Sequence, residues 1–423
     1  MMEGDMKIPK RIIKNLPPVC QLTASVVDAW GGRTYLVGGL VRDLLLDAGA
    51  LSEANRDWDI AVDLRSTGKG LLGLLKELQN RTGGRYVFHH QFLTGTLMLP
   101  ELRVDIAHTR EESYPQPAVL PEIRPAGIEA DLRRRDFTVN ALALVLSGPE
   151  TGTVIDPTGG ASDLKHRLIR IIHPLSFIDD PTRIFRAIRF AVRFGFEIES
   201  GTLHLMRQAI AAGYPALLTP ERILYELRCI CRERNALKML EAVIREGVLA
   251  ACFPKSSGPE FFGVPVRQVL NELAALVHSG AGEELLMIYL LSRLPVNERF
   301  PITREERAAR EALMNRNVLL ERLSRVRRRS SIYQLLRGVP VRALEILAVL
   351  SPGPVRSRLR LYLDELMHVQ PQLQAADLIA AGVKPGPQMG RMLERLLVAR
   401  LDRRVKSRDE ELALVHRLQS CNV

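Results

Sequence analysis

The stretch Leu36-Val-Gly-Gly-Leu-Val-Arg-Asp43 determines how the N-terminal part of the chain folds. It joins a β-prone run, residues 33–37, through two glycines to a segment whose apolar residues recur with helical spacing. Amides in such a turn can approach a phosphate closely, because glycine has no side chain and a helix N-terminus attracts anions. Gly38 and Gly39 are therefore candidate phosphate contacts, and Arg42 follows one helical turn later. For a Gly-Gly pair alone, a tight turn without a ligand is the alternative.

Acidic residues follow in the next β-prone segments. Asp57 and Asp59 flank Trp58, and the period of two in a strand places both carboxylates on one face. Asp105 adds a third acid in another short run, residues 102–106. Neighbouring carboxylates repel unless a cation lies between them, and hard oxygen ligands suit Mg²⁺. Three such acids could hold two metal ions about 3.5–4 Å apart. A solvated strand end is the alternative for an Asp-x-Asp pair. The preceding Gly-Gly turn disfavours this alternative.

A cluster of arginines lies in Asp131-Leu-Arg-Arg-Arg-Asp136, directly before an apolar run that contains Asn140. Guanidinium groups beside a core are costly unless anions neutralise them. A triphosphate would do so, because guanidinium forks match phosphate oxygens. A solvated helix start is the alternative for this motif.

A second arginine motif begins at Asp180. Arg183, Arg186 and Arg189 recur every three residues, which on a helix forms an arginine ridge beside an apolar face. Pro181 suits a first helical position. Asp180 would then either cap the helix or accept hydrogen bonds from the edge of a base to which Arg183 donates. The alternative is that Asp180 only caps the helix and that the arginine ridge is a solvated surface without a ligand.

The overall composition indicates a basic protein of several domains. The chain has 423 residues, a formal charge of +11 and a pI of about 9.7, which fits a polyanionic partner. Its apolar runs are shorter than the roughly 20 residues of a membrane span, and its five cysteines contain no C-x-x-C pair. We therefore expect a cytoplasmic location without membrane association. Strand signals nearly vanish after residue 164, which predicts an α+β fold: a mixed-sheet head (residues 1–163), a helical neck (164–255) and a helical body and tail (256–423).

Together these motifs closely resemble the bacterial-type (class II) tRNA nucleotidyltransferases and their poly(A) polymerase relatives. The matching stretches occur in the order of that family, and span roughly residues 35–227. They are Leu36-Val-Gly-Gly-Leu-Val-Arg-Asp43, Arg56-Asp-Trp-Asp59, Asp131-Leu-Arg-Arg-Arg-Asp-Phe-Thr-Val-Asn-Ala141, Ile155-Asp-Pro157 and Asp180-Pro-Thr-Arg-Ile-Phe-Arg-Ala-Ile-Arg-Phe190.

The resemblance implies a polymerase-beta-like nucleotidyltransferase head that adds C, A or both from CTP and ATP to the 3′ end of tRNA, without a nucleic-acid template. It implies two Mg²⁺ ions, with Asp57 and Asp59 as metal ligands and Asp105 as the third catalytic acid. It also implies that Asp180 and Arg183 select the incoming base. The full set of nucleotide-binding residues that it implies is Gly38, Gly39, Arg42, Arg135, Asn140, Asp180, Arg183, Arg186 and Arg189.

The chain departs from the family at two places. Asp179 stands where the family usually has Glu, and residues 107–121 replace the commoner arginine-histidine-proline version of a flexible loop that bears on which nucleotide is added. Poly(A) addition and a catalytically inactive RNA-binding homologue are the alternatives to tRNA 3′-end addition. The sequence specifies neither the nucleotides added nor the oligomeric state.

Two segments of the C-terminal half are candidates for contact with RNA. Arg322, Arg325 and residues 327–329 form a basic run that would meet phosphates or form a solvated helix face. Residues 376–390 contain a Gly-Pro turn before a helix, which would either approach a backbone phosphate or pack between two helices.

Overall fold

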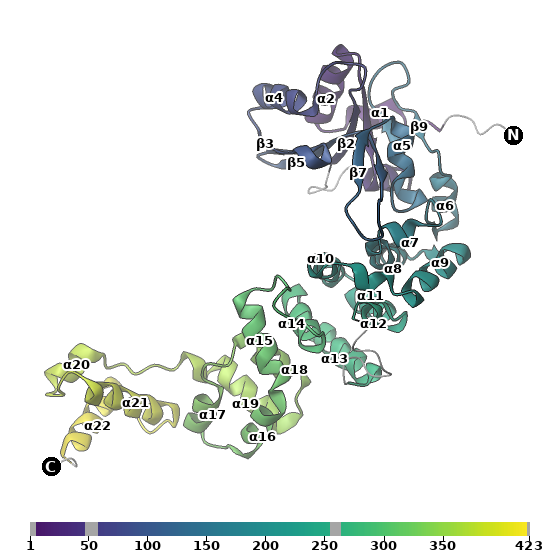
Figure 1. The fold of residues 1–423 in the computed structure, drawn as a ribbon. Helices are drawn as coiled ribbons and strands as arrows, with labels where there is room; N and C mark the ends of the chain where they lie inside the picture. The colour runs from purple at the N-terminus through teal and green to yellow at the C-terminus, as the bar shows by residue number, and fades with distance from the viewer. Residues whose placement is uncertain (1–5, 47–57, 254–263, 421–423) are drawn as a thin grey trace. The chain divides into compact units, whose positions relative to one another are not determined.

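The computed structural model describes residues 6–46, 58–253 and 264–420, and the chain forms two compact units (Figure 1). The N-terminal unit comprises Met1–Glu226 and Lys238–Pro254, and the C-terminal unit comprises Leu227–Leu237 and Lys255–Val423. Asp57 lies outside the described residues. The division into head, neck, body and tail stays a prediction.

The N-terminal unit is built on a seven-stranded sheet with the strand order β3-β4-β5-β2-β1-β8-β9. The β2–β5 pair is parallel, whereas the other neighbouring strands are antiparallel, so the predicted mixed sheet is confirmed. The strands are β1 (Arg33–Val37), β2 (Trp58–Asp63), β3 (Arg85–His89), β4 (Thr94–Leu99), β5 (Leu102–His108), β8 (Ala143–Val145) and β9 (Val154–Ile155). Two small pairs lie apart from it: β6 (Arg110–Ser113) with β7 (Glu122–Pro125), and β10 (Leu168–Ile169) with β11 (Glu197–Ile198).

The helices of this unit bury apolar faces at helical spacing. In α4 (Leu71–Thr82), the four leucines at positions 71, 74, 75 and 78 are buried. This helix packs so closely on β4 that a Cβ at Gly95 would lie 2.4 Å from Leu75 Cδ1. The other helices that begin in this unit are α1 (Lys10–Lys14), α2 (Pro18–Ala29), α3 (Gly39–Leu46), α5 (Ile128–Arg133), α6 (Gly160–His166), α7 (Ser176–Asp179), α8 (Thr182–Phe194), α9 (Ser200–Ala211), α10 (Pro220–Cys231) and α12 (Val248–Cys252), and α11 (Ala236–Arg245) lies mostly in it.

One hydrophobic cluster fixes the arginine-rich motif against the sheet. Leu132 of α5 packs with Tyr35 and Val37 of β1, and with residues of β2 and β8. Ala141, just after Asn140, belongs to the same cluster. Because Leu132 is fully buried, its replacement by alanine would cost about 2–5 kcal/mol. The cluster thereby holds the segment that follows α5 near the end of β1.

The described residues of the C-terminal unit form helices and connecting loops without a strand, as the sequence predicts. Leu378 and Val383 are buried in a cluster with Leu396 and Val415, so the segment 376–390 packs between helices. The helices are α13 (Val266–His278), α14 (Glu283–Arg293), α15 (Arg304–Met314), α16 (Arg316–Arg325), α17 (Arg329–Leu336), α18 (Val341–Leu350), α19 (Gly353–Asp364), α20 (Ala375–Ala380), α21 (Pro387–Leu401) and α22 (Arg408–Ser420).

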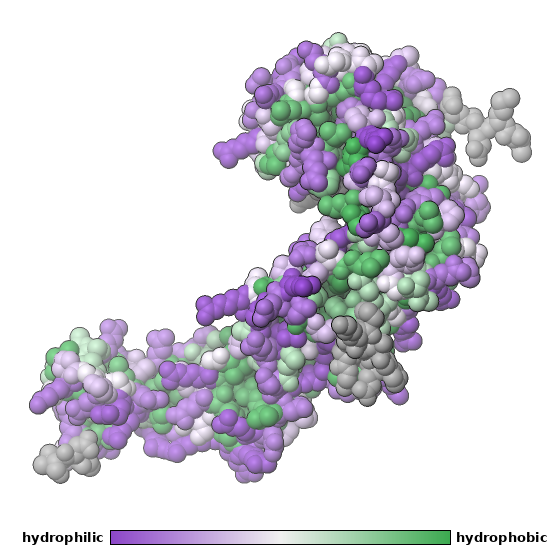
Figure 2. Space-filling model, in the orientation of Figure 1, coloured by the Kyte–Doolittle hydropathy of each residue, from purple (hydrophilic) through white to green (hydrophobic). Residues whose placement is uncertain are grey.

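The surface in view is predominantly hydrophilic, with small apolar patches on both units (Figure 2). Within the described ranges, no helix combines the length and the hydropathy that a membrane crossing requires.

Candidate active site

A cleft of about 900 Å³ lies in the N-terminal unit, and most of the residues that the sequence singled out line it. It is bordered by the turn between β1 and α3, by the segment after α5, and by one face of α8. From the predicted set it contains Gly38, Gly39, Arg42, Asp59, Arg135, Asn140, Asp180, Arg183, Arg186 and Arg189. Four motifs that are far apart in the sequence therefore meet at one site, while the role of each residue stays a prediction.

The Gly38 turn requires glycine for two reasons. Its φ of +74° lies in the left-handed region, which disfavours residues with a side chain. A Cβ there would also lie 3.2 Å from Nη1 of Arg135 and 3.5 Å from Oδ2 of Asp59. The turn is thus closely flanked by a guanidinium and a carboxylate. Gly39 begins α3, so the helix N-terminus faces the same cleft.

Asp59 and Asp105 are register partners on the parallel strands β2 and β5, which places both side chains on one face of the sheet. Oδ1 of Asp105 accepts a hydrogen bond of 2.5 Å from Thr96 Oγ1, and Oδ2 lies 3.2 Å from Nη2 of Arg103. Asp105 lines a second cavity of about 420 Å³, which shares Asp59 and Arg135 with the cleft.

This donor set fits Mg²⁺, because it offers carboxylate oxygens from adjacent strands. Among the described residues no group of three or more acidic, histidine or cysteine side chains forms a metal site. Asp57, which is predicted to bind metal together with Asp59, lies outside those residues.

Asp136 connects Asn140, and through it Arg42, to α8. Its Oδ2 accepts hydrogen bonds of 2.8 and 2.5 Å from Nε and Nη2 of Arg186, and its Oδ1 accepts one of 3.0 Å from Asn140 Nδ2. Asn140 Oδ1 in turn accepts a bond of 2.7 Å from Arg42 Nη1. Burial disfavours the charged carboxylate, but the Arg186 charge and these hydrogen bonds outweigh it and lower the pKa of Asp136 to about 2.

The arginine ridge of α8 faces the cleft and not bulk solvent. Arg183 and Arg189 are only 5% and 8% exposed, so the solvated-ridge alternative is wrong for these two residues. Nη1 of Arg183 donates to Ser176 Oγ at 2.6 Å, and Nη2 donates to the carbonyl of Arg134 at 2.9 Å. Arg193 extends the ridge by a further turn and also lines the cleft.

The N-cap position of α8 is Pro181 and not Asp180, and the helix begins at Thr182. The Asp180 side chain still binds the first residue of the helix, because its Oδ1 accepts hydrogen bonds from the Thr182 amide at 3.0 Å and from Thr182 Oγ1 at 2.6 Å. Asp180 also lines the cleft, so this contact and contact with a ligand are compatible. Asp179 is not among the described residues that border the cleft; its carboxylate lies 3.9 Å from His173 Nδ1. Burial raises the pKa of Asp179, which His173 partly offsets.

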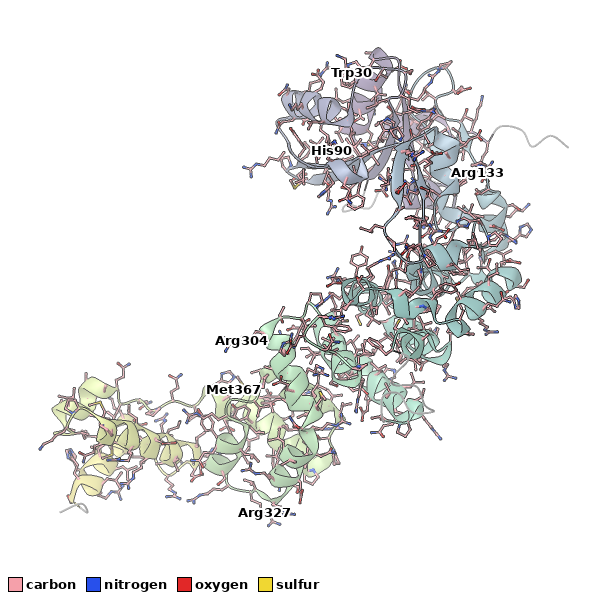
Figure 3. The ribbon with its side chains drawn as sticks, viewed as in Figure 1. Trp30, His90, Arg133, Arg304, Arg327 and Met367 are labelled. Atoms are coloured by element: carbon pink, nitrogen blue, oxygen red, sulfur yellow. The ribbon has the colours of Figure 1, made fainter. Side chains whose placement is uncertain are left out.

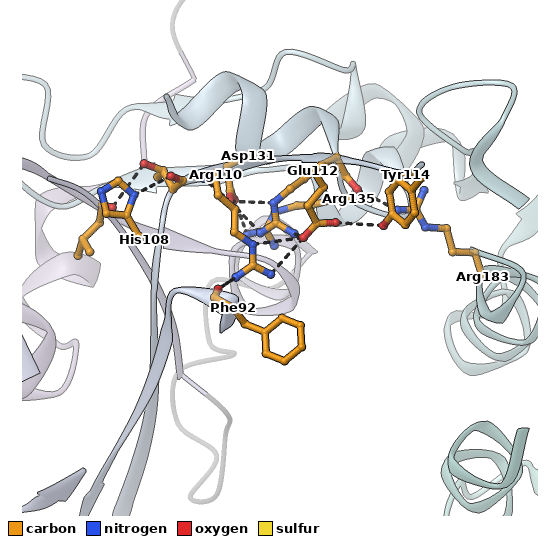
Figure 4. Close-up of polar contacts among 11 residues, drawn as sticks. Phe92, His108, Arg110, Glu112, Tyr114, Asp131, Arg135 and Arg183 are labelled. Atoms are coloured by element: carbon orange, nitrogen blue, oxygen red, sulfur yellow. Dashed lines mark hydrogen bonds and ion pairs between the residues drawn. The ribbon is translucent and has the colours of Figure 1, made fainter. Parts of the chain in front are cut away.

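Carboxylates of the chain itself already neutralise part of the arginine cluster (Figure 4). Buried Asp131 pairs with Arg134 at 2.8 Å and with Arg135 at 3.0 Å. Glu112 of β6 also accepts from Arg134 at 2.8 Å and from Tyr114 Oη at 3.0 Å. A triphosphate is therefore not needed to balance every arginine, which corrects the sequence argument.

Several residues that line the cleft are not predicted from the sequence. Asp136 belongs to the arginine motif, and its signal in the sequence is that an acid ends a run of arginines. The other missed lining residues with polar side chains are Asp43, Glu112, Tyr114, Arg134, Thr182, Arg193, Tyr225 and Glu226. Glu112 and Tyr114 belong to the unusual loop segment, and no periodic pattern marked them.

The basic run of the C-terminal unit is divided between two roles. Arg322, Arg325 and Arg327 are exposed, and Arg327 projects outward in Figure 3. Arg328 instead pairs with Asp402 at 2.9 Å, and Arg329 donates to Glu365 and to the carbonyl of Leu401. The last two arginines of the run thus connect the start of α17 to the end of α21.

The chain is similar to tRNA nucleotidyltransferases in both sequence and fold. Residues 34–170 match the Poly A polymerase head domain. The A-adding tRNA nucleotidyltransferase of Geobacter sulfurreducens is 35% identical, over 91% of this chain and 45% of that protein. The enzyme of the same description from Halalkalibacterium halodurans is 33% identical, over 84% of this chain and 81% of that protein. The chain therefore spans less than half the length of the first of these relatives.

A solved structure shares the whole fold. The Thermotoga maritima CCA-adding enzyme, complexed with tRNA-CCA, superposes with a TM-score of 0.74 at 28% identity. The match covers 99% of this chain and 100% of that one.

Proposed function

This chain belongs to the family of bacterial-type tRNA nucleotidyltransferases and poly(A) polymerases, and we propose that it adds adenosine from ATP to the 3′ end of tRNA. One observation carries the proposal: a single cleft contains the glycine turn, Asp59 and the Asp180–Arg183 pair. These are the parts needed to bind a triphosphate, to activate a hydroxyl and to distinguish a base. The two A-adding relatives, which match 84% or more of the chain, favour adenosine over cytidine.

The triphosphate would lie at the Gly38–Gly39 turn. There the start of α3 presents amides, while Arg42 and Arg135 present guanidinium groups. Arg42 is held by Asn140 and lies 4.2 Å from the centre of the Phe194 ring, so its orientation is fixed before a ligand arrives.

The reaction is an in-line displacement at the α-phosphorus. The 3′-oxygen of the RNA forms the new bond, the bond to the β-phosphate oxygen breaks, and pyrophosphate leaves with the negative charge. Mg²⁺ ions held by Asp57 and Asp59, with Asp105 as the third acid, would lower the pKa of the attacking hydroxyl and neutralise the leaving group. The arginines of the cleft stabilise the same charge from the protein side.

Asp180 and Arg183 would select the base. Asp180 offers an acceptor to an exocyclic amino group, and Arg183 offers donors to ring nitrogens or carbonyl oxygens. A base with the wrong edge leaves Asp180 Oδ2 and the remaining Arg183 donors without the hydrogen bonds that the correct base would supply, which costs about 1–3 kcal/mol per group. Selection therefore needs no nucleic-acid template.

Complete CCA addition is the second candidate, because the match to the Thermotoga maritima CCA-adding enzyme covers nearly the whole of both chains. Both candidates share the cleft chemistry, and a first experiment tests that chemistry. The protein is incubated with Mg²⁺, a tRNA ending in CC and each of the four nucleoside triphosphates separately. Incorporation from ATP that stops in excess chelator supports the proposal. No incorporation from any nucleotide would overturn it and favour an inactive RNA-binding homologue.

A further inference from the structure

The side chain of Arg222 joins two segments that border the cleft. Arg222 lies in the first turn of α10, and its Nη2 donates to Asp180 Oδ1 at 2.5 Å. Its Nη1 donates to the carbonyl of Ala118 at 2.9 Å. Ala118 lies in the loop between β6 and β7, and its amide donates to the carbonyl of Asp179 at 3.1 Å. One guanidinium therefore holds both the acid that faces the base and the loop beside it.

These contacts leave Asp180 with one oxygen for a ligand. Oδ1 accepts from the Thr182 amide, from Thr182 Oγ1 and from Arg222, whereas Oδ2 accepts no hydrogen bond within the described part of the chain. Cβ, Cγ and Oδ1 define the plane of a carboxylate, so the donors that hold Oδ1 also set the direction of Oδ2. Two of these donors come from Thr182, two residues after Asp180 in the chain, and Arg222 supplies the third and only charged one, from a different helix.

The loop shows independent signs of being held in place. Ala118 has a φ of +60°, a left-handed conformation that a residue with a side chain adopts only when its surroundings require it. At the start of the loop, Tyr114 donates to Glu112 of β6. Glu112 also binds Arg134, whose carbonyl accepts from Arg183 (Figure 4). The two residues of the base-selecting pair are thus connected to two parts of the same hairpin, Asp180 to the middle of the loop and Arg183 to β6.

We propose that Arg222 is a positioning residue for base selection. It orients the Asp180 carboxylate so that Oδ2 meets the exocyclic amino group of the incoming nucleobase, and it holds residues 114–121 against the Asp179–Asp180 segment. The inference rests on the proposed role of Asp180 in binding a nucleoside triphosphate. It goes beyond that role because it assigns selectivity to a side chain on α10.

The test uses the full-length protein with Arg222→Ala and Arg222→Lys. A lysine ammonium carries one charge at one point and cannot maintain both contacts of the guanidinium fork. Arg228→Ala is the matched control, because Arg228 lies on the same helix but pairs with Glu306 at 2.6 Å, away from the cleft residues. Incorporation from ATP is measured in competition with CTP, GTP and UTP on one RNA. KM for the RNA is measured in parallel.

We expect Arg222→Ala to reduce the preference for the favoured base by about 10-fold or more, with Arg222→Lys intermediate and Arg228→Ala unchanged. KM for the RNA should stay constant in all three. An unchanged preference in Arg222→Ala, with normal folding, would overturn the positioning role. If Arg222→Ala does not fold, the base preference of Arg222→Lys is compared with that of the wild type. An unchanged preference in Arg222→Lys would then overturn the positioning role.

A second measurement needs no turnover. Amide hydrogen exchange at residues 114–121 of the free protein should be faster in Arg222→Ala than in the wild type, and unchanged in Arg228→Ala. Unchanged exchange would contradict the contact itself. If exchange is faster in Arg222→Ala but the wild-type protein incorporates no nucleotide, the contact is supported and the proposed function is refuted.

Discussion

Two basic regions of this molecule look alike in sequence and differ in structure. The ridge of α8 and the run at residues 322–329 are both rich in arginine and both predict a helix with a charged face. In α8, Arg183 and Arg189 are buried against the cleft, whereas Arg322 and Arg327 are exposed. The difference shows that the density of arginines does not identify a ligand site. What separates the two regions is that the α8 arginines lie in a cleft together with residues of three other motifs.

The physical reason lies in orientation and solvation. Arg186 is held by two hydrogen bonds to buried Asp136, so its remaining donors point in a fixed direction in a partly dehydrated cleft. An exposed guanidinium retains its rotamers and its water, and each such contact contributes about 1 kcal/mol or less. The fixed arginines of α8 suit recognition of one small anion. The exposed arginines suit a long polyanion, which many charges contact at the same time.

The largest effect is expected in the cleft at Asp59→Ala. Removing a carboxylate that would bind metal should reduce incorporation by about 10³-fold or more, while binding of tRNA changes little. Single-turnover incorporation and an RNA-binding titration on the same preparation measure the two quantities. Activity that survives this change would show that Asp59 does not hold the metal.

Next in size is Asp136→Asn. The substitution removes the buried charge that accepts two hydrogen bonds from Arg186, which should destabilise the protein by about 2–3 kcal/mol. Glu365→Gln is the matched change in the C-terminal unit, where the partly exposed carboxylate should contribute about 1 kcal/mol or less. Urea denaturation of both variants checks the contrast, and equal losses would remove the distinction between the two regions.

The contribution of Asp136 to the free energy of unfolding depends on pH. The pKa of Asp136 is lowered to about 2, so its stabilising effect is complete above the ordinary value near 4 and is lost as the pH falls through about 2. The difference in unfolding free energy between wild type and Asp136→Asn should therefore shrink by on the order of 2 kcal/mol across that range.

A smaller effect is expected at Arg183→Ala. Loss of its donors should reduce discrimination between bases by about 10- to 100-fold and weaken triphosphate binding less. Competition among the four nucleotides measures the first quantity, and KM for ATP the second. A large rise in KM with unaltered base preference would make Arg183 a phosphate ligand.

The smallest effect is expected from Arg322→Ala combined with Arg327→Ala. These side chains are exposed, so KM for tRNA should rise a few-fold and its salt dependence should become shallower, while KM for ATP stays constant. Arg329→Ala should instead lower the melting temperature, because Arg329 binds the carbonyl of Leu401 and Glu365. A change in KM for ATP would contradict the separation of the two regions.

Local patterns allowed much of this fold to be predicted. The glycine turn at Gly38, the register of Asp59 in its strand and the helix from Thr182 all follow from periodicities of two and 3.6 residues. The two-residue strands β10 and β11 were not predicted, because they are too short to show a period.

The partners within the site could not be predicted. Arg186 pairs with Asp136 across 50 residues, and Arg222 reaches Asp180 across 42 residues and Ala118 across 104. Such pairs depend on how the segments pack in three dimensions. The sequence shows the charges but not which acid holds which arginine.

The most direct test of the proposed activity uses tRNA transcripts that end at the discriminator base, at C or at CC. Each is incubated with the purified protein, Mg²⁺ and CTP, ATP or both, and the products are sized at single-nucleotide resolution. We predict that only transcripts ending in CC are extended, by a single A from ATP. Extension of the shortest transcript to CCA would contradict an activity restricted to A, and long A ladders would indicate a poly(A) polymerase.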